Sequence, residues 1–372
     1  MKILVIGSPK RDFHVGFDAL VLGLARLGAD FDHYPNILTQ SYGHTGTYQL
    51  SFDTARISYP DFRTVEENLG RGRYGLVITM VSRVDYRGGR HGYLSYLSRR
   101  LKFSLPSNRP RMGGSIVSEW IRKGVKLPPF IVVDDLDDPF IHPVDYALLK
   151  RCAVYFKREL PFNRFQAFRL FRFHLENEEL MALASKLRPV WISYDRPSIE
   201  AFADLDSVPP YCEREIDITF LGSTHASYSR QMLIKALDGL KKRYRVITPE
   251  GGRKTKGEFY DALKRSRIVI SMDGRGWDAT KHYELPLFGG LLFIARPTVE
   301  TAIGLKDGHN CVFIDNHAKD LEGLAGRYLS NPSLSAEIAQ RGMDFARNEL
   351  GNARLAEYVL KTAGEALKGD AP

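Results

Sequence analysis

The chain has 372 residues, of which 44% are hydrophobic and 26% are charged, with a net charge of +9, so we expect two domains of a globular enzyme. No apolar run approaches the roughly 20 residues that span a bilayer, and the N-terminus lacks a signal-peptide pattern, which predicts a cytoplasmic protein. The cysteines stand far apart without CxxC spacing and are expected to be reduced core residues without a metal or disulfide role: Cys152, Cys212 and Cys311.

The excess of positive charge lies in the first 190 residues, which carry 28 Lys and Arg against 19 Asp and Glu, while the remainder carries 25 of each. Eleven basic residues and two acidic ones lie between Arg83 and Lys126. This region favours a polyanion or an anionic membrane surface as partner, unless it is only a solvated basic face. We predict that basic residues of this half contact such an anionic partner, which for a transferase would be its acceptor: Arg11, Arg87, Arg90, Arg99 and Arg100.

The N-terminal residues predict the start of a doubly wound α/β domain, with a strand at residues 2–6, a helix at 17–27 and a strand at 31–34. Ligands of such domains collect at the carboxyl ends of the strands. The loop after the first strand is not a GxGxxG fingerprint. It contains Asp12 and His14, either of which is a candidate general base, although an exposed loop also holds such residues by chance.

An apolar strand that runs into four aspartates follows at residues 128–138. Asp135 and Asp137 allow two interpretations. In the first, they hold a divalent ion on a donor diphosphate, as a DxD motif does. In the second, which we favour, no metal is involved, and the two carboxylates bind acceptor hydroxyls, act as a base or are structural.

Proline interruptions and a restart of the strand and helix pattern predict the domain boundaries. Residues 1–190 are expected to form an N-terminal Rossmann-like acceptor domain, and residues 191–210 a linker. Residues 211–350 are expected to form a second Rossmann-like domain that binds an activated, phosphate-bearing donor substrate. We interpret residues 351–372 as a C-terminal helix that can cross back to the N-terminal domain.

The second α/β unit opens with a strand that ends in Gly222, Ser223 and Thr224, ahead of a helix whose first turn carries Arg230. A turn rich in glycine and hydroxyls before a helix is a phosphate cradle, because its backbone N–H groups are unpaired. Thr248 follows the next strand and is expected at the same edge of the sheet, so we predict that Thr248 and Arg230 contact a phosphate-bearing donor together with residues 222–224.

Residues 268–294 predict a buried strand, a glycine-containing loop, a short helix and a second buried strand. Pro286 limits the start of this helix to about residues 282–284. Lys281 and Glu284 then lie at its mouth, where Lys281 can neutralise a leaving diphosphate and Glu284 can accept from two ribose hydroxyls. The alternative is a helix start with solvent-exposed charges. Further donor contacts are predicted for Asp273, Arg275 and Tyr283.

Several segments together suggest a family: TFLGST (219–224), KHYELPLFGGLLFI (281–294), DGHNCVFID (307–315), YLSNPSLSAEIAQRGMDFA (328–346), VDDLDD (133–138) and YFKRELP (155–161). In these segments the chain resembles glycosyltransferases of the GT-B fold, and most closely glycosyltransferase group 1 or the CgeB-like set. The resemblance covers most of the chain and is closer in the second half. It implies an α/β fold of two Rossmann-like domains that face a cleft, with a helical C-terminal tail.

The resemblance also implies sugar transfer from a nucleotide-diphosphate donor, with a UDP-sugar as the expected co-substrate and no further cofactor. Glu284 matches the family's ribose-binding glutamate, Lys281 a basic contact to the diphosphate, and residues 222–224 the glycine turn near the phosphates. Many retaining members carry another glutamate eight positions before the ribose-binding glutamate. In this sequence that position, eight residues before Glu284, is Gly276. This departure favours an inverting displacement that uses a base from the first half of the chain and no metal.

Two other functions stay open at this point. One is a nucleotide-sugar 2-epimerase on the same scaffold, which needs no acceptor. The other is a polyanion-binding protein without enzymatic activity. For a transferase, the basic region predicts an anionic glycan, a lipid-linked acceptor at the inner face of the membrane, or DNA as acceptor, in that order.

Overall fold

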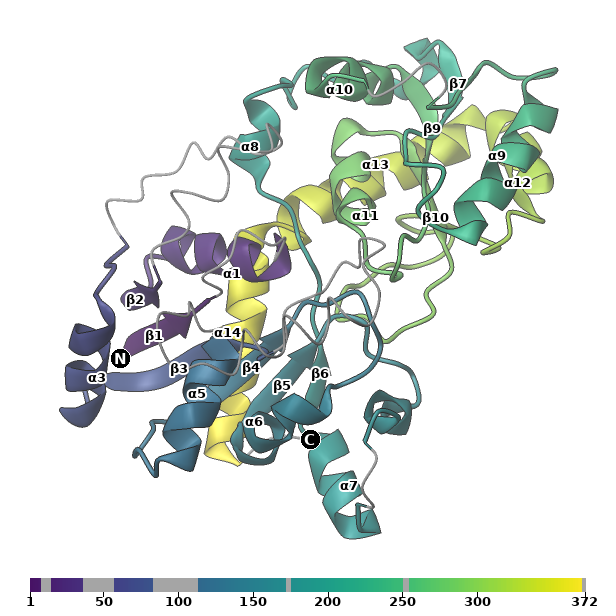
Figure 1. Ribbon diagram of the computed structural model, residues 1–372. Helices are drawn as coiled ribbons and strands as arrows, with labels where there is room; N and C mark the ends of the chain where they lie inside the picture. Colours follow the sequence, from purple (N-terminus) through teal and green to yellow (C-terminus); the bar gives the residue numbers. More distant parts are fainter. Residues whose placement is uncertain (8–14, 36–56, 83–112, 172–174, 250–253, 370–372) are drawn as a thin grey trace, which may run out of the picture.

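The computed structural model describes residues 1–7, 15–35, 57–82, 113–171, 175–249 and 254–369, which form two α/β domains (Figure 1). Each domain is built around one parallel sheet, so the predicted fold class is confirmed. Within the described ranges, no helix has both the length and the apolar character needed to cross a bilayer.

The sheet of the N-terminal domain has the strand order β2-β1-β3-β4-β5-β6, and every neighbouring pair is parallel. Its strands are short apolar runs buried on both faces, as parallel strands covered by helices require. Their bounds are Lys2–Ile6 (β1), Phe31–Tyr34 (β2), Tyr74–Met80 (β3), Phe130–Asp134 (β4), Val154–Lys157 (β5) and Leu187–Pro189 (β6).

Helices cover both faces of this sheet (Figure 1). Alternate strand residues point to opposite sides, so Val5 packs in one apolar cluster and Leu4 in another. The first cluster contains residues of α1 (Val15–Arg26) and of the C-terminal helix α14 (Asn352–Lys368). The second cluster contains residues of four helices: α3 (Phe62–Gly70), α5 (Gly113–Arg122), α6 (Tyr146–Arg151) and α7 (Asn177–Ser185).

The sheet of the C-terminal domain has the order β11-β10-β9-β7-β8, again with parallel neighbours. Its strands are Ile216–Thr219 (β7), Val246–Ile247 (β8), Ser266–Ser271 (β9), Leu291–Ala295 (β10) and Val312–Ile314 (β11). Its helices are Tyr228–Leu240 (α9), Lys256–Lys264 (α10), Thr280–Glu284 (α11), Leu321–Leu329 (α12) and Pro332–Glu349 (α13).

The chain ends by returning to the N-terminal domain. Helix α13 packs on β10, and α14 then runs along the N-terminal sheet and packs against α1 (Figure 1). The two helices approach closely at Gly23, where an added Cβ would lie 2.0 Å from the carbonyl oxygen of Asn352. A glycine is therefore required for this contact between the two ends of the chain.

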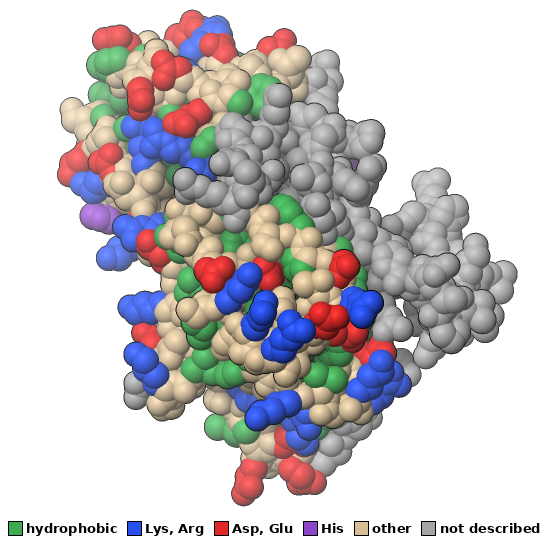
Figure 2. All heavy atoms as spheres, turned by 90° about the vertical axis from the view of Figure 1, so that its left-hand side faces the viewer, with side chains coloured by type: hydrophobic (Ala, Val, Ile, Leu, Met, Phe, Trp, Pro, Cys, Tyr) green, Lys and Arg blue, Asp and Glu red, His purple; other side chains and the backbone are tan. Residues whose placement is uncertain are grey.

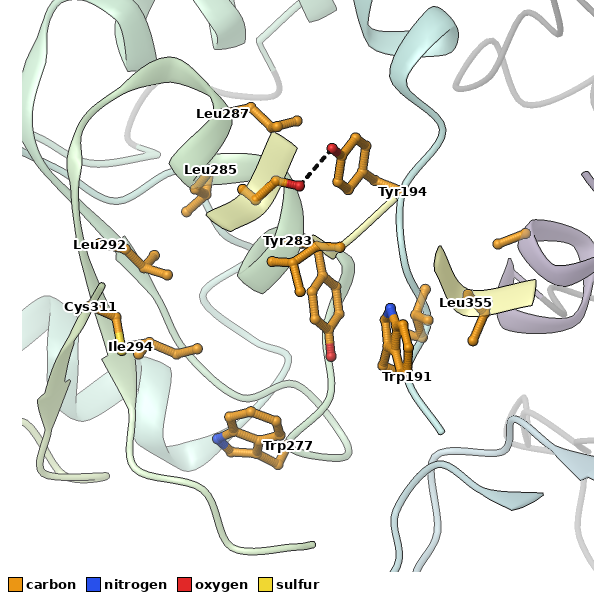
Figure 3. Packing of buried hydrophobic residues seen from close by; sticks show 14 of the residues in the cluster. Trp191, Tyr194, Trp277, Tyr283, Leu285, Leu287, Leu292, Ile294, Cys311 and Leu355 are labelled. Carbon is orange, nitrogen blue, oxygen red and sulfur yellow. Dashed lines mark hydrogen bonds between the residues drawn. The ribbon is translucent and has the colours of Figure 1, made fainter. Parts of the chain in front are cut away.

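The segment between the two sheets is part of the core. Trp191 and Tyr194 are buried, and Figure 3 shows Trp191 between Tyr283 and Leu355, with Tyr194 above Tyr283. The Tyr194 hydroxyl donates to the carbonyl of Ala346 at 2.8 Å. The expected linker is thus fixed by apolar contacts to both domains, and it contains a short helix, α8 (Arg196–Glu200).

Two local predictions were wrong. Helix α11 begins at Thr280 rather than near residue 282, because Pro286 lies in the 3-10 helix that follows α11, Leu285–Phe288, instead of in the first turn of α11. Gly289 ends this helix with φ +66°, a conformation that favours glycine. Cys212 is exposed and not a core residue, whereas Cys152 and Cys311 are buried, and all three are free.

Candidate functional site

The strand order predicts a ligand site at one point of the C-terminal sheet. Strand β7 lies between β8 and β9, so the connections on its two sides leave in opposite directions. In open α/β sheets, ligands bind outside the carboxyl ends of the strands at such a switch point. The loop after β7, residues 220–227, and the loop after β9, residues 272–279, meet there. We call the second of these the donor loop.

Arg230 joins the two loops from the first turn of α9. Its guanidinium donates to the carbonyls of Asp273 at 2.7 Å, Met272 at 3.1 Å and Ser223 at 3.2 Å. The side chain is buried, and burial lowers its pKa. Arg230 was predicted to contact the donor substrate, and in the structure three of its five N–H groups donate to main-chain carbonyls. It therefore holds the loops together and adds positive charge beneath them.

The glycine turn after β7 is tightly packed. A Cβ on Gly222 would lie 2.6 Å from the Phe220 ring, so no larger residue fits without a shift. Ser223 is exposed and Thr224 is half-buried. Ser227 caps α9 by accepting from the backbone N–H of Arg230 at 3.2 Å. The turn thus presents backbone and hydroxyl groups beside the start of a helix, as a phosphate cradle does.

Three other predicted donor residues lie around the same loops. Asp273 accepts from the Ser229 hydroxyl at 3.2 Å, and burial raises its pKa. Arg275 is exposed at the tip of the donor loop. Thr248 is buried directly after β8. The structure thus gathers these side chains at the carboxyl edge of one sheet, although it buries them to very different extents.

Lys281 of α11 reaches back to the glycine turn. Its ammonium donates to the carbonyl of Leu221 and lies 4.8 Å from the centre of the Phe259 ring. Burial lowers the pKa of Lys281 to about 8, against the opposing effect of Glu284. A desolvated ammonium beside a glycine turn is favourably placed to meet an anion, because the anion would restore the interactions lost with water.

Glu284 is held from the side by α10. It is 6% exposed, and its Oε1 accepts from the Tyr260 hydroxyl at 2.5 Å. The Tyr260 ring stacks on Phe288 with centroids 5.0 Å apart, and Lys256 donates to the Tyr260 oxygen at 3.4 Å. Solvent-exposed charges, the alternative interpretation of this helix, are excluded for Glu284.

The donor loop is anchored on its inner side by His282. The ring nitrogens lie 2.6 Å from the Trp277 carbonyl and 2.7 Å from the Ser271 hydroxyl. A carbonyl only accepts, so Nε2 carries the proton and Nδ1 accepts from Ser271. Burial lowers the pKa of His282 to about 4. This neutral imidazole fixes the loop ahead of Lys281.

Tyr283 does not join the other predicted donor residues. It is fully buried in the apolar core (Figure 3), and its hydroxyl donates to Asp278. Side chains of α11 therefore point in different directions. Lys281 points to the glycine turn, whereas Tyr283 points into the core.

The two predicted acceptor aspartates have separate partners in the N-terminal domain. Asp135 is buried and accepts from the backbone N–H of Phe17, near the start of α1, at 3.2 Å. Asp137 pairs with Arg158. Across the part of the chain that the structure describes, no three His, Cys, Asp or Glu side chains are grouped so that they could hold a metal ion.

The other predicted residues lie outside the described ranges: Asp12, His14, Arg11, Arg87, Arg90, Arg99 and Arg100. In the sequence, Asp12 and His14 follow β1, a strand that borders the β1/β3 switch point of the N-terminal sheet. Of the predicted basic region, Arg122, Lys123 and Lys126 are described and exposed. Figure 2 shows basic and acidic side chains intermingled over the described part of one face.

Sequence reasoning missed two residues at this site. One is Tyr260, which orients Glu284. The other is Glu159, at the carboxyl end of β5, whose carboxylate accepts from the backbone N–H groups of Trp277 and Asp278. One feature of the sequence could have indicated Glu159. The charged residues 157–159 stand at the end of a buried strand, and the carboxyl ends of strands are where ligand sites lie.

Comparisons with known proteins bear on the fold and on the C-terminal domain. Residues 214–361 match the family model described as glycosyl transferase-like. No match is found among curated proteins. The matched segment contains the glycine turn, the donor loop and α11, which are the elements that build the candidate site.

Solved structures with a similar fold cover nearly the whole chain. A glycosyltransferase from Rickettsia africae ESF-5 has a TM-score of 0.57 at 12% identity, over 99% of this chain and 98% of that one. An alpha-glucosyltransferase in complex with UDP has 0.52 at 9% identity, over 98% and 100%. Anabaena Alr3699/HepE in complex with UDP has 0.50 at 11% identity, over 98% and 100%. At such identities the likeness shows the fold, which is the GT-B fold.

Proposed function

We propose that the protein is a glycosyltransferase that moves a sugar from a UDP-sugar to an acceptor hydroxyl. The observation that carries the proposal is the placement of Lys281 and Glu284 on α11, next to the glycine turn at the switch point of the C-terminal sheet. The family match of residues 214–361 supports it. Two structural neighbours that contain UDP are consistent with the nucleotide.

The donor's diphosphate binds against the glycine turn. Backbone N–H groups and the ammonium of Lys281 face it, and Arg275 at the exposed tip of the donor loop adds a second cation. Glu284 keeps one carboxylate oxygen on Tyr260 and accepts from the ribose hydroxyls with the other. Charge that develops on the departing diphosphate is then stabilised in a largely desolvated site, where electrostatic interactions are strong.

The reaction is a single displacement at the anomeric carbon. The acceptor oxygen forms a bond to that carbon, the bond from the carbon to the diphosphate oxygen breaks, and UDP leaves with the electron pair. The acceptor proton passes to a base of the N-terminal domain, for which His14 and Asp12 are the candidates. We propose that Lys281 and the backbone groups replace a metal, and that Asp135 and Asp137 serve the acceptor side.

The acceptor is proposed to be anionic, because the basic excess lies in the N-terminal domain. An anionic glycan ranks ahead of a lipid-linked acceptor at the inner face of the membrane, and DNA follows. Arg11, Arg87, Arg90, Arg99 and Arg100 are the proposed contacts.

The test begins with a thermal-shift screen against UDP-, GDP-, CMP- and dTDP-sugars, since a ligand that binds only the folded state raises the melting temperature. We expect a shift with a UDP-sugar and none with Glu284→Gln, which keeps the size of the side chain. Incubation with the UDP-sugar alone should give at most slow hydrolysis. Release of an epimer would contradict the proposal and indicate a 2-epimerase, and binding of polyanions without any nucleotide binding would exclude an enzyme of this kind.

A further inference from the structure

The donor loop of the C-terminal domain is bound by a carboxylate of the N-terminal domain. Glu159 follows β5, and its Oε2 accepts from the backbone N–H of Trp277 while its Oε1 accepts from that of Asp278, both at 2.9 Å. Glu159 is 3% exposed. Two adjacent backbone donors thus use both oxygens of one buried carboxylate that comes from 118 residues earlier in the chain.

This contact exists because residue 276 has no side chain. A Cβ on Gly276 would lie 2.3 Å from Oε1 of Glu159 and 2.4 Å from its carboxyl carbon. No other residue therefore fits at position 276 while Glu159 is in place. The glycine and the glutamate form a matched pair across the two domains.

Further contacts connect the same loop to the linker and to α11. Oδ2 of Asp278 accepts from the backbone N–H of Ile192 at 2.9 Å, and Oδ1 accepts from the Tyr283 hydroxyl. The Nε of Arg158 lies 3.6 Å from Glu159 and 3.9 Å from Asp278. The position of α11 therefore depends on groups from outside its own domain.

We propose that Glu159 is a positioning residue for the donor. By binding the backbone of Trp277 and Asp278, it fixes the segment directly ahead of α11 and so sets where Lys281 and Glu284 lie relative to the glycine turn. Donor affinity then depends on the arrangement of the two domains seen in this structure. This inference rests on the proposed function for its donor and on the contacts above for its geometry.

The test uses Glu159→Gln, whose amide keeps the size of the side chain but offers one acceptor oxygen and places an NH₂ against an N–H donor. The matched control is Glu300→Gln. Glu300 also bridges the domains, accepting from Arg164 at 2.8 Å through each oxygen, but it does not touch the donor loop. Loss of any interdomain carboxylate can lower the melting temperature, so stability alone does not distinguish the two variants.

Two readouts distinguish them. Hydrogen exchange without ligand should show faster exchange over residues 277–284 in Glu159→Gln and no change there in Glu300→Gln. The Kd for UDP and the KM for the UDP-sugar should rise about tenfold or more in Glu159→Gln only, because a buried charged hydrogen-bond partner is lost. Unchanged exchange over residues 277–284, or an unchanged Kd for UDP, overturns the inference.

A double-mutant cycle tests the matched pair itself. Gly276→Ala should lower the melting temperature in the presence of Glu159 and have a smaller effect in Glu159→Ala, where the clash is removed. Equal effects in both backgrounds would contradict the contact. If the wild-type protein binds no nucleotide sugar, the proposed function fails and the donor role of Glu159 fails with it, while the exchange and cycle experiments still decide whether Glu159 holds α11.

Discussion

The hydroxyl of Tyr260 donates a 2.5 Å hydrogen bond to Oε1 of Glu284 and so fixes the carboxylate that we assign to the donor ribose. Both side chains are buried, and Tyr260 is in turn packed on Phe288. One oxygen of Glu284 is therefore committed within the protein, and the plane of the carboxylate is set before any ligand binds. Such pre-organisation reduces the entropy that is lost on binding.

Removing the Tyr260 hydroxyl should weaken donor binding. Tyr260→Phe keeps the stacked ring, and we expect the KM for the UDP-sugar to rise about 10- to 150-fold, the equivalent of about 1.5–3 kcal/mol for a lost hydrogen bond to a charged group. Steady-state kinetics check this. Tyr328→Phe, on α12, is the matched control and should leave the KM unchanged. A Tyr260→Phe enzyme with the wild-type KM would show that the orientation of Glu284 does not matter.

Lys281 should make UDP binding depend on pH. Its pKa is lowered by burial to about 8, so above pH 8 the free protein holds a neutral amine that must take up a proton when a diphosphate binds. The affinity for UDP should therefore fall by up to about tenfold per pH unit above pH 8. Calorimetry in buffers of different ionisation enthalpy measures the proton uptake.

Two variants separate this effect from other pH dependence. Lys281→Met should bind UDP more weakly and with little change between about pH 7 and pH 9.5, since no titrating cation remains. Lys281→Arg keeps a charge over that range, because an arginine stays protonated. A wild-type affinity that stays flat across the same range would exclude a direct contact between Lys281 and the diphosphate.

Replacing Gly222 by any larger residue should destabilise the protein for steric reasons. In Gly222→Ala the new Cβ would lie 2.6 Å from the Phe220 ring and 3.4 Å from Nη1 of Arg230. We expect a loss of about 1–3 kcal/mol in the free energy of unfolding, as for other overpacked sites. Urea denaturation measures it.

Gly239→Ala, in α9, is the matched glycine control. Its new Cβ meets nothing within 4 Å, so the free energy of unfolding should be unchanged or slightly higher. If the two alanine variants were equally stable, the tight packing of the glycine turn would be disproved.

If His14 or Asp12 is the general base, replacing it should slow turnover without weakening the binding of UDP. His14→Ala or Asp12→Ala should lower kcat by about 10²- to 10⁴-fold for the residue that acts as the base, while the Kd for UDP stays within about twofold. Single-turnover kinetics and calorimetry measure the two quantities. A wild-type kcat in both variants would show that neither His14 nor Asp12 is the base.

Much of the fold follows from local patterns. The short runs at residues 216–221 and 268–270, rich in β-branched residues, predicted strands that the structure confirms, since such residues favour buried parallel strands. Lys281 and Glu284 were identified because they stand three residues apart at the mouth of one short helix that follows a glycine-containing loop. These signals act over a few residues, which is why a single sequence reveals them.

The rest depended on contacts between distant segments. Glu159 and Trp277 lie 118 residues apart, and nothing near either of them indicates the other. The sequence shows that Arg230 is a cation but not that its donors are used by three carbonyls. Tyr283 follows two residues after Lys281, yet the turn of the helix directs it into the core. Such orientations are set by tertiary packing.

The most direct measurement is a crystal structure of the protein with UDP bound. The account predicts the diphosphate against the turn of residues 222–224, within hydrogen-bond distance of Lys281, and the ribose hydroxyls on Glu284. A nucleotide bound elsewhere, with Lys281 still on the Leu221 carbonyl and Glu284 in contact with Tyr260 alone, would contradict it.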